Sequence, residues 1–217
     1  MVERRAVVTV LAGTNGAGKS SIAGATLRSF RGEYYNPDEA ARAHREAHPG
    51  ATVEDANAAA WEFGRSLLDE AIRDRKDFAF ETTLGGRTIA SLLERAAGAG
   101  LDVRIWYVGL ATVELHLKRV QQRVRLGGHD IPEAMIRRRF ENGPRNLIRL
   151  MPRLASLRVY DNSAPGDPAA GVALKVLLIL HMEKRRIVGP KSLTLTPEWA
   201  KPIVARALEL HGEPRAR

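Results

Sequence analysis

Apolar and polar positions along the chain follow a repeated strand–helix order. Short apolar runs rich in valine, leucine and aromatic residues predict buried strands within 5–12, 77–86, 101–110 and 156–163. Apolar residues at helical spacing predict helices at 20–30, from 36, from 52, at 89–98, at 112–126 and from about 132. The helix from 52 is expected to turn one face inward: Ala56, Ala60, Phe63, Leu67 and Ala71. This alternation predicts the α/β class, with three layers and a mainly parallel sheet covered by helices on both faces.

The chain changes character beyond Ala164. Residues 172–188 predict two strands around a turn, and 197–210 predict a terminal helix. With 217 residues, of which 44% are hydrophobic, the chain is long enough to bury one full α/β core. We therefore expect a single domain over 1–217, in which 1–165 form the core and 166–217 complete the fold.

The strongest motif is GTNGAGKS, from Gly13 to Ser20, which matches G-x-x-x-x-G-K-[ST] between a predicted strand and a predicted helix. In such a loop the glycines let backbone N–H groups converge on phosphate oxygens, and Lys19 reaches the β- and γ-phosphates. The Ser20 hydroxyl takes a Mg²⁺ position. We expect ATP and Mg²⁺ as cofactors, although the motif does not choose between ATP and GTP. The expected nucleotide-binding residues are Gly13, Thr14, Asn15, Gly16, Ala17, Gly18, Lys19, Ser20 and Ser21.

A phosphate loop alone does not separate kinases from ATPases and switches. An ABC-type or motor ATPase would carry a long apolar strand ending in Asp or Asp-Glu, whereas the nearest segment here, FAFE, ends in the single Glu81. A guanine-reading NKxD-like segment is also missing from the sequence. The remaining motifs therefore favour a phosphotransferase.

Six motifs in order carry a family resemblance: GTNGAGKSS, YYNPDEAAR, FETTLGGR, an arginine-rich helix, RLGGHDIP and VYDNS. Together they span residues 5–165, and over this span the chain resembles the zeta-toxin family of P-loop kinases. The resemblance implies a nucleoside-kinase-like fold and transfer of phosphate from ATP to a hydroxyl of UDP-N-acetylglucosamine. It also raises a separate antitoxin protein as a partner.

The same resemblance implies roles on the acceptor side. Asp38 would be the general base, and its place beside the carboxyl end of a strand suits that role because ligands of open α/β sheets bind there. Asn36, Glu81 and Thr83 would contact the substrate. A simpler reading is that these residues only cap a helix and end a strand. Glu62 is a weak candidate for one more family carboxylate.

Arginines on the two helices after residue 112 are the candidates for neutralising transferred phosphate. The resemblance implies that Arg123 has this role, on the same helix face as Arg119. The second lid arginine of the larger toxins aligns near His129 of this chain, and for that role we favour Arg138 over its neighbours 137 and 139. Any one of these arginines can also be an ordinary solvated residue.

Charge and composition limit the partners. Lys and Arg number 34 against 25 acidic residues, a net charge of +9 that favours anionic ligands. Nucleic acid is a weaker expectation than a phosphate-handling lid, because aromatic residues are scarce among the basic ones. The sequence has no cysteine and no apolar run of about 18–20 residues, so we expect a cytoplasmic protein without a membrane span.

Two alternatives stay open beside a sugar-nucleotide kinase. One is a kinase for another small hydroxyl compound or for a polynucleotide end. The other is a nucleotide-dependent regulatory binding protein, in which the basic helices would contact nucleic acid and the loop would act as a switch.

Overall fold

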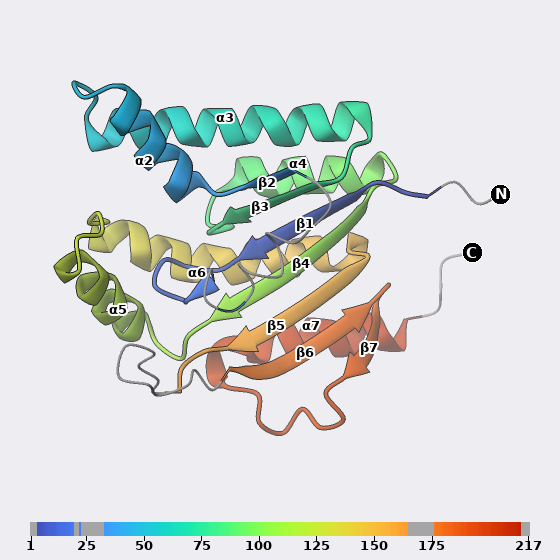
Figure 1. Ribbon diagram of the computed structural model, residues 1–217. Coiled ribbons are helices and arrows are strands. Elements are labelled where there is room, and N and C mark those ends of the chain that lie inside the picture. The colour runs from blue at the N-terminus through green and yellow to red at the C-terminus, as the bar shows by residue number, and fades with distance from the viewer. Residues whose placement is uncertain (1–3, 20–21, 23–32, 165–175, 214–217) are drawn as a thin grey trace.

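A computed structural model of the protein describes residues 4–19, 22, 33–164 and 176–213. Within these residues a seven-stranded sheet forms the centre of the molecule (Figure 1). Its strands are β1 (Val7–Ala12), β2 (Glu33–Tyr35), β3 (Phe78–Thr82), β4 (Asp102–Gly109), β5 (Ser156–Asp161), β6 (Leu177–Glu183) and β7 (Arg186–Gly189). They lie in the order β2-β3-β1-β4-β5-β6-β7, in which the first five are parallel. β6 pairs with β5, and β7 with β6, in antiparallel register, which confirms the predicted C-terminal hairpin.

The helices surround this sheet. They are α2 (Pro37–Ala47), α3 (Val53–Asp74), α4 (Arg87–Gly98), α5 (Val113–Arg125), α6 (Glu133–Leu150) and α7 (Lys201–Gly212), with short 3-10 turns η1 (Met151–Arg153) and η3 (Glu198–Ala200). Figure 1 shows α4, α6 and α7 along one face of the sheet, α2 and α3 beside β2, and α5 at the carboxyl ends of the parallel strands. No helix in the described part of the chain is long and apolar enough to cross a bilayer.

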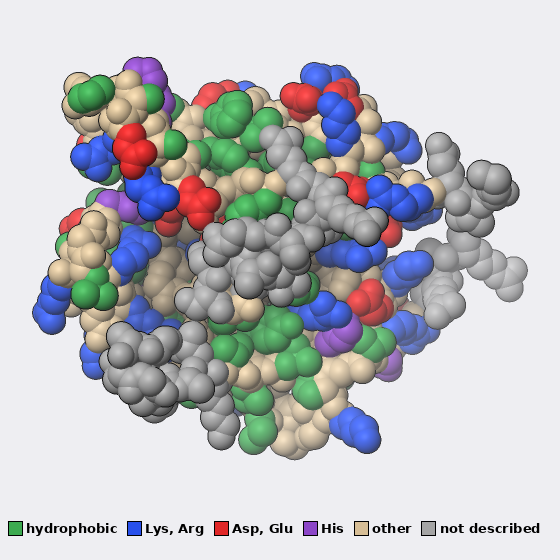
Figure 2. All heavy atoms as spheres, viewed as in Figure 1, with side chains coloured by type: hydrophobic (Ala, Val, Ile, Leu, Met, Phe, Trp, Pro, Cys, Tyr) green, Lys and Arg blue, Asp and Glu red, His purple; other side chains and the backbone are tan. Residues whose placement is uncertain are grey.

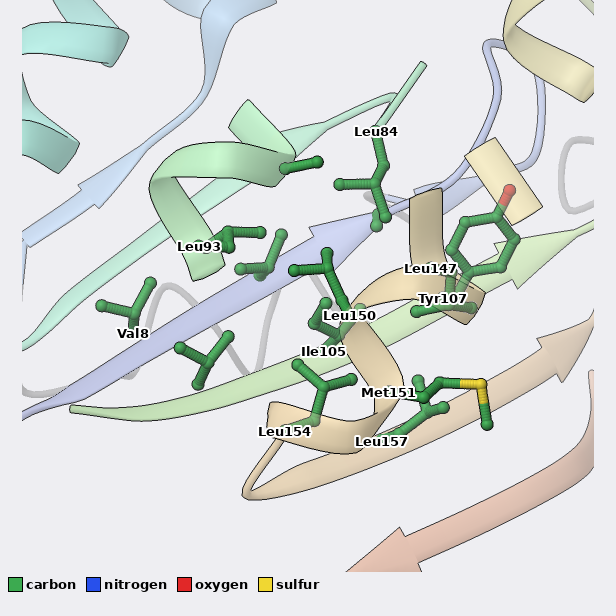
Figure 3. Close-up of a cluster of buried hydrophobic side chains, with 14 of the residues drawn as sticks. Val8, Leu84, Leu93, Ile105, Tyr107, Leu147, Leu150, Met151, Leu154 and Leu157 are labelled. Carbon is green, nitrogen blue, oxygen red and sulfur yellow. The ribbon is translucent and has the colours of Figure 1, made fainter. Parts of the chain in front are cut away.

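Strand alternation divides the apolar residues between the two faces of the sheet. Val8, Val10 and Ala12 of β1 join a large core cluster with residues of α4, α6 and α7, part of which Figure 3 shows. On the other face Leu11 packs with Ala17 of the phosphate loop, and Ile22 lies against the same cluster. The rest of the helix expected at 20–30 lies outside the described residues. The main core thus holds the strands rigidly under the loops at their carboxyl ends.

The helix beginnings follow their caps. Asn36 caps α2, with Pro37 in the first turn, and Thr52 forms a full capping box with Asp55 at the start of α3. Both helices therefore begin where the sequence predicts.

One predicted core position of α3 is wrong, because Phe63 is 57% exposed. α3 packs closely against Tyr35 at Gly64, where an added Cβ would lie 2.4 Å from the Tyr35 ring. Phe63 is consequently left at the edge of that ring, with the ring centres 5.8 Å apart. Leu68 and Ile72 are buried further along α3.

Candidate active site

The phosphate loop has the backbone that its glycines permit. Gly13, Gly16 and Gly18 have φ angles of +145°, +80° and +81°, a region that side chains other than glycine rarely adopt. A Cβ at Gly13 would lie 2.2 Å from the carbonyl oxygen of Val108, and one at Gly16 would lie 2.8 Å from that of His116. The loop therefore packs directly against β4 and α5. Backbone N–H groups in such a glycine-rich turn can form a concave site for anions. Of the expected nucleotide-binding residues, 20 and 21 lie outside the described part.

Side chains from two other elements hold this loop. The Nδ1 atom of His116, in α5, lies 2.8 Å from the carbonyl oxygen of Asn15, and the Asn162 amide donates to the carbonyl of Ala17 at 2.9 Å. Both side chains are almost fully buried. Burial, with smaller effects from the nearby charges of Lys19 and Arg119, lowers the pKa of His116 to about 4. The imidazole is therefore neutral at pH 7, and the bound carbonyl identifies Nδ1 as the protonated nitrogen.

Lys19 lies at the centre of the charged groups. Its ammonium donates to the carbonyl oxygen of Gly13 at 2.9 Å. Burial lowers the pKa of Lys19, while the carboxylates of Glu81 and Asp38 act in the opposite direction. The lysine and both carboxylates line one cavity, so they share one site.

Asp38 stands in the first turn of α2 and is exposed to solvent. Its backbone N–H donates to Oδ1 of Asn36 at 2.9 Å, which fixes the turn. Its Oδ2 lies 3.7 Å from Nη1 of Arg123, on α5. In Figure 2 acidic and basic side chains meet between the α2 and α5 regions, on the left of the view. The predicted base and the predicted phosphate-binding arginine are thus neighbours.

Glu81 is the penultimate residue of β3 and is 6% exposed. Its Oε1 accepts hydrogen bonds from the Tyr34 hydroxyl at 2.5 Å and from Nδ2 of Asn36 at 3.3 Å. Asn36 therefore both caps α2 and contacts Glu81. Thr83 lies just beyond β3, and its hydroxyl accepts from the N–H of Gly85 at 3.4 Å.

These residues line one large cavity of about 580 Å³, within the range of small-molecule sites. Its walls include Asn15, Lys19, Asn36, Asp38, Asn57, Trp61, Glu81, Thr83, His129, Arg138 and Arg139. A second hollow of about 560 Å³ shares Asp38, Asn57 and His129 with it and reaches Arg123. Glu62 lines neither cavity. Its side chain pairs with Arg65, which does line the first one.

The arginines of α5 and α6 occupy different places. Arg119 donates to the carbonyl of Asn162 at 2.8 Å, and Arg123 donates to the carbonyl of His129 at 3.2 Å. In α6 it is Arg139 that reaches the phosphate loop, with Nη1 2.7 Å from Oδ1 of Asn15. Burial lowers the pKa of Arg139, and Arg138 adds to that effect.

The preference for Arg138 therefore has to be reconsidered. Arg138 is exposed on the cavity wall, and Arg137 pairs with Glu133 and Glu114 away from it. A signal was available in the sequence, since Ile136, Phe140 and Gly143 form an inward stripe and position 139 lies three residues after the first of them.

The described residues contain no group of three or more His, Asp or Glu side chains that could hold a metal. In phosphate-loop proteins Mg²⁺ is held mainly by the triphosphate, water and one hydroxyl. Ser20, the expected hydroxyl, lies outside the described part.

Known proteins share this fold and parts of the sequence. An uncharacterised protein of Haemophilus influenzae (strain ATCC 51907 / DSM 11121 / KW20 / Rd) is 33% identical over 132 residues, covering 59% of this chain and 88% of the relative. A chain of the AvrRxo1-ORF1:AvrRxo1-ORF2 complex solved with ATP matches with a TM-score of 0.64 and 16% identity. The match covers 94% of this chain but only 64% of that one.

A structure of the PezAT chromosomal toxin–antitoxin system of Streptococcus pneumoniae matches with a TM-score of 0.56 and 15% identity, covering 98% of this chain and 90% of that one. At these identities the structures establish the fold alone. The family is shown by the sequence, because the Zeta toxin family model matches residues 2–164. The phosphate loop adjoins the cavity that Asp38 and Glu81 line. The family match shows that the chain belongs to the zeta toxin family of P-loop kinases.

Proposed function

We propose that this protein transfers the γ-phosphoryl group of ATP to a hydroxyl of UDP-N-acetylglucosamine or a similar sugar nucleotide. The observation that carries the proposal is the convergence of Lys19, Asp38, Arg123 and Arg139 around one phosphate loop and its adjoining cavities. Phosphoryl transfer depends mainly on positioning and on neutralising charge, and these four groups provide both. Family membership supports the same reaction class.

On the donor side, the backbone N–H groups of the loop and the Lys19 ammonium bind the phosphates. Arg123 and Arg139 approach from α5 and α6 and neutralise charge on the oxygens of the transferred group. The buried Nε of Arg123 has no hydrogen-bond partner within the described chain, so it is available to a phosphoryl oxygen. Mg²⁺, when bound with the triphosphate at the Ser20 hydroxyl, would supply further neutralisation of phosphate charge.

On the acceptor side, Asp38 accepts the proton of the attacking hydroxyl. Its exposure at the cavity wall gives a substrate direct access to the carboxylate. Glu81, held by Asn36 and Tyr34, and Thr83 bind other hydroxyls of the acceptor. Trp61, on the facing helix α3, offers an apolar surface to a ring.

The first experiment incubates the purified protein with Mg·ATP and UDP-N-acetylglucosamine and follows the phosphorylated product by mass. Wild type is expected to form product, while Lys19→Ala and Asp38→Asn are not. Asp69→Asn is the matched control, because that carboxylate pairs with Arg95 outside the cavities. If ATP binds and no product appears, the acceptor is another hydroxyl compound. Product formed equally by Asp38→Asn would rule out the proposed base.

We also propose a separate antitoxin protein as a partner, which the family supports. Expression of wild type in bacterial cells is expected to arrest growth, and expression of Asp38→Asn is not. Growth unaffected by an active wild-type enzyme would remove the reason for an antitoxin.

A further inference from the structure

Trp199 belongs to the part of the chain beyond the family match, which ends at residue 164. It lies in the η3 turn before α7, and its indole packs against the carboxyl end of β4. A Cβ built on Gly109 would lie 2.4 Å from the ring, so the indole touches the strand backbone itself. The ring centre lies 6.2 Å from that of Tyr107, which lines the same small cavity as Thr14 of the phosphate loop.

The same indole holds the carboxyl end of β5. Its Nε1–H donates to Oδ1 of Asp161 at 2.9 Å, and the Ser163 hydroxyl donates to the same oxygen at 2.6 Å. Between these two residues stands Asn162, whose side-chain amide donates to the carbonyl of Ala17. Trp199 thus holds the Asp161 carboxylate, and the next residue, Asn162, binds the phosphate loop.

Asn162 is packed too closely to move without moving the loop. A Cβ on Gly18 would lie 2.6 Å from its Nδ2 atom, and its own N–H donates to the carbonyl of Gly109 at 3.0 Å. Its carbonyl accepts from Arg119 at 2.8 Å. In a close-packed region of this kind a shift of Asp161 is passed to the residues it adjoins.

We propose that Trp199 is a positioning residue for ATP binding, acting through Asp161 and Asn162 on the backbone of Ala17 and Gly18. Trp199 and Thr14 both line a cavity of about 130 Å³, so the indole and the phosphate loop face the same small space. The inference rests on the proposed function for the nucleotide, and it is independent of the acceptor. The segment after residue 164 is thereby part of the nucleotide site.

The test compares ATP dissociation constants of full-length variants without acceptor. Trp199→Phe keeps an aromatic ring and removes the indole N–H, and it is expected to weaken ATP binding about fivefold, in line with one hydrogen bond. Leu208→Ala, at a 53% exposed position of α7, is the control for altering the C-terminal region and is expected to match wild type. Thermal melting by circular dichroism checks that each variant is folded.

A second comparison separates positioning from general support. If Trp199 acts through Asn162, Trp199→Phe combined with Asn162→Ala weakens ATP binding by less than the product of the two single effects. A dissociation constant for Trp199→Phe within twofold of wild type, or strictly multiplicative effects, would overturn the inference. Wild type that binds ATP but phosphorylates no sugar nucleotide would refute only the proposed acceptor, because the ATP comparison still decides the role of Trp199.

Discussion

The guanidinium of Arg123 lies 3.7 Å from the carboxylate of Asp38, so an arginine from α5 faces the proposed base on α2. The two side chains are 37% and 59% exposed, and an ion pair in such surroundings contributes little to folding, with a median of about 0–1 kcal/mol. The value of the pair is therefore in placing both groups beside the phosphate loop, where α2 and α5 approach each other.

Arg123→Ala is accordingly expected to separate activity from stability. The rate constant kcat should fall by roughly 10²-fold or more, because phosphoryl charge loses a forked donor. The free energy of unfolding should change by less than about 1 kcal/mol. Denaturant unfolding and steady-state kinetics measure the two quantities. Arg145→Ala is the control, because it breaks an exposed arginine–glutamate pair within α6. A large loss of stability with kcat preserved would show that Arg123 is structural.

Arg139 and Arg138 provide a comparison of adjacent residues. Arg139 contacts Asn15 in the phosphate loop, whereas Arg138 is exposed on the cavity wall. We expect Arg139→Lys to lower kcat/KM for ATP by roughly tenfold or more, because lysine lacks the planar fork. Arg138→Lys should lower it less than threefold, in keeping with the small effect of most surface changes. Equal losses at both positions would contradict the assignment of Arg139 as the loop arginine.

Trp61 gives a prediction about the acceptor. It is 47% exposed and lines the cavity with Asn57, one turn before it on α3. Tyr35 holds α3 in place by close contact with Gly64 and a hydrogen bond to the carbonyl of Ala60. If the indole stacks on a ring of the acceptor, Trp61→Ala raises the acceptor KM about tenfold, equal to about 1.4 kcal/mol.

The ATP dissociation constant should be unchanged in Trp61→Ala, and Trp61→Phe should keep most of the acceptor affinity. Steady-state kinetics with varied UDP-N-acetylglucosamine give the KM, and nucleotide titration gives the ATP constant. An unchanged KM for acceptor in Trp61→Ala would remove Trp61 from the acceptor site.

The elements that local pattern specifies were predictable from the sequence. Caps such as Asn36 and Thr52, the β-branched runs of the strands and the glycines of the loop each act through neighbours in the chain. The fold class and the position of the phosphate loop follow from them. Asp38 lines the same cavity as Lys19, beside the carboxyl end of β2, the kind of place where ligands of open α/β sheets bind.

Long-range packing decided the rest. The choice between Arg138 and Arg139 depends on how α6 is rotated against Gly85, where a Cβ would lie 2.7 Å from Cγ of Arg139. The exposure of Phe63 depends on the contact of Tyr35 with α3. The spacing within α6 places position 139 near the inward face of that helix, but the partners of Arg139 and of Phe63 lie in segments far away in the chain.

His116 makes the phosphate loop sensitive to acid. Its folded-state pKa is about 4, against about 6.5 in an unfolded chain, because burial disfavours the charged ring. Between these values the unfolded chain binds more protons than the folded one, so stability falls as pH drops from about 6.5 to about 4. The full difference corresponds to about 3 kcal/mol at most, at 1.36 kcal/mol per pH unit. Above pH 6.5 the contribution is constant.

His116→Gln removes this titration and can still donate to the carbonyl of Asn15. We therefore expect wild type to lose more stability than the variant between pH 6.5 and pH 4, as measured by urea unfolding at each pH. The difference between the two proteins isolates His116 from the carboxylates, because their titration is common to both proteins. Parallel curves for the two proteins would mean that the ring accepts a proton in the folded state.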